Sequence, residues 1–175
     1  MQTTVERYKN NSGKEIIQGE GIYRDVKFSY RVHKASNQKE YSHVLKASII
    51  SPNTNRILQF GGKRYNDFRK KLDKKIELLT VEVKKLDPMS AEFQKAESVL
   101  RRQMTKKERL GANLPIEDLN ATASTYLTSV DDKTIKKAFE EVVVRLYADY
   151  QDDIFQALGS GSGQRSEEII LIHII

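Results

Sequence analysis

The residues of this chain that could do chemistry are its clustered lysines and arginines. Closely spaced cations can hold phosphate groups, and a tyrosine beside them can stack on a nucleobase. The candidate anion-binding residues are Lys27, Arg31, Lys46, Arg64, Tyr65, Arg101, Arg102, Lys106 and Lys107. The pattern predicts a basic surface for nucleic acid. Acidic residues are interleaved among these cations, so a solvated face of ion pairs is the alternative interpretation.

The sequence carries no recognisable set of catalytic residues. His33 falls on the polar phase of a predicted strand, His43 on the core phase of another, and His173 in the C-terminal tail. There is no Gly-rich phosphate loop, no His-x-x-x-His pair and no Gly-x-Ser-x-Gly stretch. The chain has no cysteine, which excludes disulfides, thiol catalysis and thiolate metal sites. We therefore expect a protein that is not an enzyme and uses no cofactor or metal.

One short stretch resembles a motif of PX domains, the Arg-Arg-Tyr-x-Asp-Phe sequence that follows three strands in that family. Here the stretch is Lys63-Arg64-Tyr65-Asn66-Asp67-Phe68. The resemblance implies that Arg64 and Tyr65 meet a phosphoinositide headgroup, which is a third function hypothesis. It covers these six residues and the strand order, and the chain has too few prolines, three in all, for the family's proline-rich membrane loop. An ordinary helix start, with Phe68 opening its core stripe, is the alternative.

The C-terminal tail has a composition unlike the rest of the chain. Residues 159–163 alternate Gly and Ser, which is typical of a flexible linker, and we interpret them as an engineered tether. Residues 164–175 are then a peptide of a partner protein fused to the domain; a natural flexible tail is the alternative. The segment lacks Pro and Gly and carries little charge, as a strand buried on both faces would. Its aliphatic residues are Ile169, Ile170, Leu171, Ile172, Ile174 and Ile175.

This tail carries the main function hypothesis. An extended peptide can add to the edge of a sheet, where backbone hydrogen bonds supply affinity and side-chain pockets supply specificity. We therefore expect a non-enzymatic adaptor or chaperone-like module that captures a short aliphatic β-strand of a partner protein, by β-augmentation. Nucleic-acid binding through the basic helices and the sheet face is the alternative. The sequence leaves the identity of the partner and the oligomeric state open.

Length and charge bound these hypotheses. With 175 residues, 31% of them charged, the chain is expected to form one domain and to hold no transmembrane segment. Its first residues are polar, without a signal peptide, so we expect an intracellular protein. Residues 1–60 hold ten basic and five acidic side chains, residues 61–110 fifteen and eight, and residues 111–158 four and nine. The acidic last third could itself lie against the basic part.

The first sixty residues predict an antiparallel sheet. Two short strands are expected over residues 3–9 and 14–18, with a break at residues 19–21. Apolar side chains then alternate from Ile22 to Val32 and again over residues 41–51, which places Lys27, Arg31 and Lys46 together on the polar face. Pairing positions that sum to 75 sets Val26 opposite Ile49 and closes on a two-residue turn, Asn37-Gln38. Residues 56–60 are a further expected strand.

The remainder predicts helices. Apolar residues recur every three or four positions from Phe68 to Leu86 and again from Phe93 to Met104, with Asp87 as a cap and Pro88 opening the second helix. These two segments form a predicted basic helical hairpin. Residues 113–129 are ambiguous, and a last helix runs from Asp131 or Asp132. The predicted fold is α+β, with an antiparallel meander of three to five strands, the hairpin, and a C-terminal helix packed on the sheet, all in one domain over residues 1–158.

Overall fold

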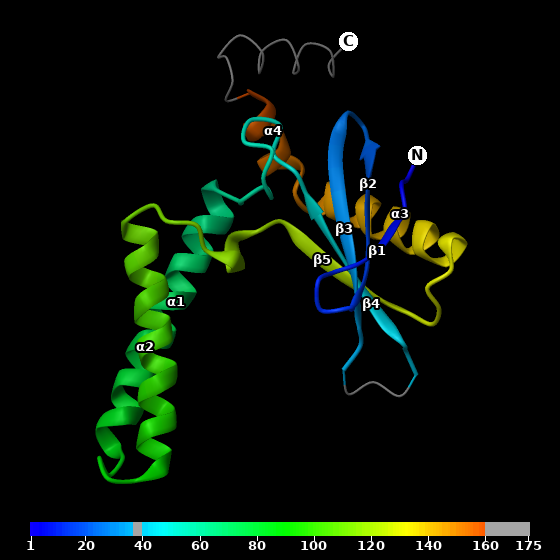
Figure 1. The fold of residues 1–175 in the computed structure, drawn as a ribbon. Helices are drawn as coiled ribbons and strands as arrows, with labels where there is room; N and C mark the ends of the chain where they lie inside the picture. The colour runs from blue at the N-terminus through cyan, green and yellow to red at the C-terminus, as the bar shows by residue number, and fades with distance from the viewer. Residues whose placement is uncertain (37–39, 160–175) are drawn as a thin grey trace. The chain divides into compact units, whose positions relative to one another are not determined.

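The computed structural model describes residues 1–36 and 40–159, and these form an α+β protein (Figure 1). The chain divides into two compact units. Unit 1 comprises residues 1–59 and the chain from residue 120 onward, and unit 2 comprises residues 60–119. The predicted fold class is therefore confirmed. That residues 1–158 form a single domain stays a prediction.

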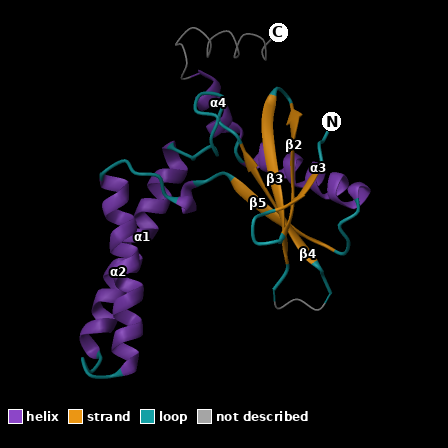
Figure 2. Cartoon of the chain, viewed as in Figure 1, coloured by secondary structure: helices purple, strands orange, loops and turns teal. Residues whose placement is uncertain are grey.

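Unit 1 is built on a five-stranded antiparallel sheet whose strands lie side by side in sequence order (Figure 2). The strands are β1 (Glu6–Lys9), β2 (Glu15–Tyr23), β3 (Val26–Lys34), β4 (His43–Ile49) and β5 (Thr122–Leu127). The last strand comes from the segment that the sequence left ambiguous, and it pairs with β4 although unit 2 lies between them in the chain. Its Ala, Ser and Thr residues give a weak strand signal, so β5 depends on its partner strand.

Strand β2 continues through the glycines at which the sequence predicted a break. A Cβ atom on Gly19 would lie 2.0 Å from the carbonyl oxygen of Thr4 and 2.6 Å from Tyr30 Oη. The phenol of Tyr30 passes over Gly19 and donates a hydrogen bond of 2.6 Å to that carbonyl. Burial raises the pKa of Tyr30 to about 12, which keeps the phenol a donor. Gly19 is thus required by close packing inside the strand.

The turn between β2 and β3 also differs from the prediction. Arg24 and Asp25 both have positive φ, 49° and 63°, as a two-residue type I′ hairpin requires. Arg-Asp is a rare sequence for such a turn. The alternation of apolar residues therefore predicted one strand from Ile22 to Val32, without a turn at these two residues. Ile22, predicted to share the core face, lies in β2 instead and is 64% exposed.

The register of β3 and β4 is offset by one core pair from the prediction. Phe28, not Val26, lies opposite Ile49, and Tyr30 lies opposite Ala47. The offset is two residues along one strand, so every side chain keeps its predicted face. The predicted turn at Asn37-Gln38 lies outside the described residues. The strand expected over residues 56–60 is reduced to two isolated bridges, Ile50 with Ile57 and Gln59 with Asn120.

Helix α3 (Asp132–Asp149) covers one face of the sheet, the inner face, and α4 (Gln151–Gly159) adds Ile154 to the same core. The predicted single last helix is therefore two, interrupted at Tyr150. Asp131 caps α3 by accepting from the backbone N–H of Thr134, and hydrogen bonds from Ser129 and Thr134 lower the pKa of its carboxyl to about 2. The core of unit 1 contains Phe28, Tyr30, Leu45, Ile49, Leu127, Ile135, Phe139, Val142, Val143, Leu146 and Ile154.

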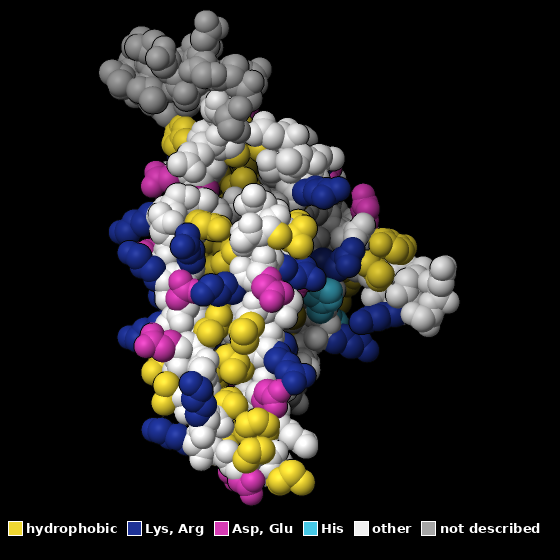
Figure 3. All heavy atoms as spheres, turned by 90° about the vertical axis from the view of Figure 1, so that its left-hand side faces the viewer, with side chains coloured by type: hydrophobic (Ala, Val, Ile, Leu, Met, Phe, Trp, Pro, Cys, Tyr) yellow, Lys and Arg dark blue, Asp and Glu magenta, His cyan; other side chains and the backbone are white. Residues whose placement is uncertain are grey.

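Unit 2 is the predicted helical hairpin. It consists of α1 (Gly62–Lys85), α2 (Ala91–Gly111) and the short 3₁₀ helix η1 (Glu117–Leu119). Helix α2 begins at Ala91 with Ser90 as its cap, three residues later than predicted from Pro88. Figure 3 shows hydrophobic side chains following a line down the hairpin, with Lys and Arg on both sides. The small core of this unit is Leu72, Leu110, Ile116 and Leu119.

Replacing Phe28 by Ala should lower the free energy of unfolding by roughly 3–5 kcal/mol, because its ring is 0% exposed and its removal leaves a cavity. Lys27→Ala, on the opposite face, should cost about 1 kcal/mol or less, since it removes one solvent-exposed ion pair, with Glu20. Urea denaturation measures both. Equal losses would contradict the placement of Phe28 on the core face and Lys27 on the outer face.

Candidate functional site

The outer face of the sheet, opposite α3, brings three predicted anion-binding residues onto one surface. Arg31 of β3 lies directly opposite Lys46 of β4, and Ser124 of β5 continues the same row. Lys27 lies on this face too, but its ammonium group is 3.1 Å from the carboxylate of Glu20. Arg31 and Lys46 are therefore the cations of the three that remain available to an external anion.

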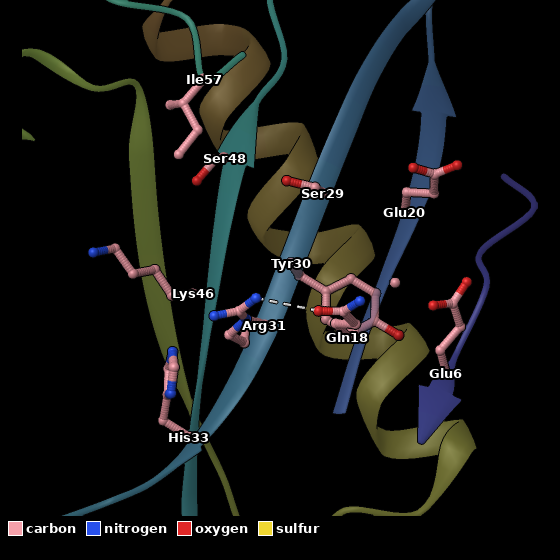
Figure 4. A pocket seen from close by; sticks show the side chains of 11 residues that line it. Glu6, Gln18, Glu20, Ser29, Tyr30, Arg31, His33, Lys46, Ser48 and Ile57 are labelled. Atoms are coloured by element: carbon pink, nitrogen blue, oxygen red, sulfur yellow. Dashed lines mark hydrogen bonds between the residues drawn. The ribbon is translucent and has the colours of Figure 1, made fainter. Parts of the chain in front are cut away.

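A hollow lies on this face. Its volume is about 480 Å³, and its centre is lined by small residues, Ser29 directly opposite Ser48, with Gly19 nearby. Figure 4 shows Arg31, His33 and Lys46 on one side of the hollow and Glu6 and Glu20 on the other. The remaining lining residues are Gln18, Tyr30 and Ile57. The site is thus polar, shallow and divided into a cationic side over β3 and β4 and an acidic side over β1 and β2.

The cationic side is unbalanced. Like charges directly opposite each other destabilise an antiparallel pair. Within the described ranges, Arg31 has one polar side-chain partner, the amide of Gln18 at 3.3 Å, and neither Arg31 nor Lys46 has an acidic one. Burial lowers the pKa of His33 below its usual value, and the positive charges of Arg31, Lys14 and Lys46 lower it further. This corner therefore carries a positive potential that its own side chains leave uncompensated.

A pair of aromatic rings borders the cationic side, and sequence reasoning did not single it out. Tyr126 of β5 lies opposite Val44, which lies opposite His33, so these three form the row next to that of Arg31 and Lys46. The Tyr126 ring is 49% exposed and stacks on Tyr41, with 5.2 Å between centroids and 25° between planes. Tyr126 had one local signal in the sequence, the alternation of side chains typical of a strand. That signal lay in a segment for which no neighbouring strand was predicted.

The hairpin places the other predicted anion-binding residues differently. Tyr65 packs against the core of unit 2, so the aromatic that the PX resemblance assigned to a headgroup has a structural role. Three of the cations are matched by acidic neighbours, Arg101 by Glu97, Lys106 by Asp118 and Lys107 by Asp73. Arg64 and Arg102 are exposed on α1 and α2. Headgroup binding by Arg64 and Tyr65 stays a prediction.

A second hollow is aliphatic. It is a cleft of about 110 Å³ in unit 1, and its apolar lining residues are Val26, Ile49, Ile50, Pro52, Leu58, Ile154, Ala157 and Leu158. Asp25, Lys27, Ser51 and Asn55 complete the lining. The side-chain amide of Asn53, in the loop that follows β4, donates to the carbonyl oxygen of Ala157 at 2.6 Å, which ties the loop to the last turn of α4. The cleft therefore lies between the end of the sheet and the point at which α4 ends.

The edge of β5 offers backbone groups in a row. The Ile49 N–H donates to the carbonyl of Ala121, so alternation directs the backbone N–H and C=O of Thr122, Ser124 and Tyr126 away from β4. Arg145 of α3 donates to the carbonyl of Ser124 at 3.3 Å, in agreement with this direction. The opposite edge, β1, is four residues long and exposed throughout. Of the two edges of the sheet, β5 is therefore the better candidate for the addition of a further strand.

Comparison with protein-family models, with curated proteins and with solved structures found no match. The function must therefore be argued from the sites themselves. In the described part of the chain, no helix is long and apolar enough to cross a membrane, and no group of three or more His, Asp or Glu side chains is placed to hold a metal ion. The segment of residues 164–175, which carries the predicted captured peptide, lies outside the described residues.

The positive potential at His33 can be measured directly. Arg31→Gln and Lys46→Gln each remove a positive charge near the imidazole, so each should raise the pKa of His33 toward 6.5, and Arg31→Gln should raise it more. An NMR titration of the His33 ring protons gives the value. Lys137→Gln, an equal charge change on α3, should leave it unaltered. A His33 pKa that stays constant in all three variants would contradict the arrangement.

Proposed function

We propose that this protein is a non-enzymatic interaction module, an adaptor or chaperone-like protein that captures a short aliphatic β-strand segment. The observation that carries the proposal is the aliphatic cleft at the end of α4. The segment it takes is the one that this chain carries itself, residues 169–175, which stand for the binding segment of a partner protein.

The chemistry and size of the cleft fit a branched aliphatic side chain. Its lining includes four side chains of Ile or Val and two of Leu, and an apolar cavity of ~150 Å³ holds a molecule the size of benzene. A cleft of about 110 Å³ therefore suits one Ile or Leu side chain. Burying such a side chain contributes roughly 1.5–3 kcal/mol. The hydrogen bond from Asn53 to Ala157 ties the loop to the last turn of α4, so two walls of the cleft are in place before a ligand arrives.

The position of the cleft in the chain favours the same occupant. Leu158, in the last turn of α4, lines the cleft, and residues 160–168 separate that turn from the aliphatic segment. A nine-residue chain rich in Gly and Ser has an end-to-end distance of about 15–18 Å. Such a tether gives an effective concentration in the millimolar range, at which an interaction worth about 4 kcal/mol half-fills the site. Burial of one aliphatic side chain therefore has to be supplemented by further contacts of the segment.

Strand addition at β5 would extend this contact. Because side chains alternate along a strand, a segment that is aliphatic at nearly every position presents apolar groups to both faces. The outward N–H and C=O groups of β5 would supply hydrogen bonds, with Arg145 leaving the carbonyl of Ser124 as the strand arrives. The residues that alternate toward one face are either Ile170, Ile172 and Ile174, or Ile169, Leu171 and Ile175.

The absence of native cysteine allows a direct test in the full chain. A spin label on Cys introduced by His173→Cys should broaden the methyl NMR signals of Leu58 and Ile154, which line the cleft, far more than that of Val32, near the other end of β3. Combining the label with serine at all six aliphatic positions of residues 169–175 should remove this selectivity, because the aliphatic side chains are then gone while the tether is unchanged. Broadening that persists in the six-serine variant would refute capture of the aliphatic segment.

A change in the cleft wall provides the complementary test. Leu158→Ser removes one aliphatic wall of the cleft and should reduce the broadening of Leu58 several-fold. Gln156→Ser, on the exposed side of the same turn, should leave it as in the parent chain. If both variants behave alike, the segment binds elsewhere and the assignment to this cleft is wrong.

A further inference from the structure

The geometry points to a second binding function on the outer face of the sheet, where Arg31, Lys46 and Tyr126 together form a site for single-stranded nucleic acid. The cations take backbone phosphates and the exposed ring takes a base. This site is independent of the aliphatic cleft, since the two hollows share no lining residue.

The first argument is electrostatic. Arg31 and Lys46 are directly opposite each other, and in the described ranges no carboxylate is paired with either of them. Their mutual repulsion is a cost that the free protein bears, and an anion placed between them removes it. Arg also offers a planar fork of donors that matches a phosphate group. The serine hydroxyls of the hollow, on the paired Ser29 and Ser48, add neutral donors next to the cations.

The second argument is the aromatic pair. Tyr126 is 49% exposed, and its ring stacks on that of Tyr41. This stacking orients the Tyr126 ring before a base binds. Stacking of one base on an aromatic side chain raises affinity roughly 5- to 150-fold and tolerates any base. The ring belongs to the row beside Arg31 and Lys46, at the spacing of two residues along the strands, roughly 7 Å. Phosphate and base groups of one nucleotide strand can therefore reach both rows.

The third argument concerns the form of nucleic acid and its path. Duplexes keep their base faces stacked inside, so a sheet surface with an exposed ring favours unpaired bases. The hollow carries Glu6 and Glu20 on its other side, over β1 and β2 (Figure 4). These carboxylates repel phosphates and confine the strand to β3, β4 and β5. A free phosphate would occupy the cations alone and leave Tyr126 without a role.

The test uses the full chain and a fluorescein-labelled ten-nucleotide oligothymidylate, with binding followed by anisotropy from low to moderate salt. We expect Arg31→Gln combined with Lys46→Gln to weaken binding and to reduce the slope of log affinity against log salt by about 1.4, for two lost phosphate contacts. Tyr126→Leu should weaken binding roughly 5- to 150-fold with little change in that slope. Lys136→Gln combined with Lys137→Gln, on α3, is the matched charge control and should bind as the parent does.

Three results would overturn the inference. One is no binding of the oligonucleotide by the parent chain at low salt. Another is a loss caused by Arg101→Gln with Arg102→Gln that equals the loss from Arg31 and Lys46, because the hairpin would then hold the phosphates. The last is equal affinity for a duplex of the same length, which would show a site for phosphate charge alone. Preference for the single strand that is lost in Tyr126→Leu supports it.

Discussion

The packing of α3 across one face of the sheet is the interaction on which the rest of unit 1 depends. Phe139 is fully buried, and its ring lies 4.5 Å, centroid to centroid, from that of Tyr30. Tyr30 in turn reaches over Gly19 to the carbonyl of Thr4, so the same contact holds the N-terminal segment. Once α3 occupies this face, the phase of each strand is fixed, because slipping by one residue would bury its polar side chains.

The two hollows are consequences of that arrangement. Because one helix closes the inner face, the outer face can remain polar, and the shallow hollow over Ser29 and Ser48 needs no apolar cover. The interruption at Tyr150 allows α4 to turn away from α3 and meet the loop after β4, and this meeting creates the aliphatic cleft. One unit thus carries two hollows of opposite chemistry, one lined mainly by charged and polar side chains and the other mainly by aliphatic ones.

Charge density by itself is a poor guide to where an anion would bind in this protein. The hairpin segment has the largest excess of basic residues, yet three of its cations are matched by carboxylates, Lys107 and Asp73 among them. Exposed pairs of this kind stabilise a fold by about 1 kcal/mol or less, and they also leave less positive potential for a ligand. The sheet has fewer cations, and Arg31 and Lys46 lack such partners among the described residues. They differ from the unmatched cations of the hairpin in lying directly opposite each other on neighbouring strands, next to the row that holds Tyr126.

The sequence alone determined which face each side chain of β3 and β4 occupies, the two helices of the hairpin and the α+β class, because these follow from periodicities of two and of 3.6 residues within a single segment. It also placed Lys27, Arg31 and Lys46 on one face. The register, the strand through Gly19 and the turn at Arg24 were decided by tertiary contacts. Tertiary contacts also decided that β5 forms, and its pairing with β4 places Tyr126 beside Arg31 and Lys46. The pairing of β4 with β5 joins segments that unit 2 separates in the chain. Such a non-local contact cannot be predicted from the residue pattern of either segment alone.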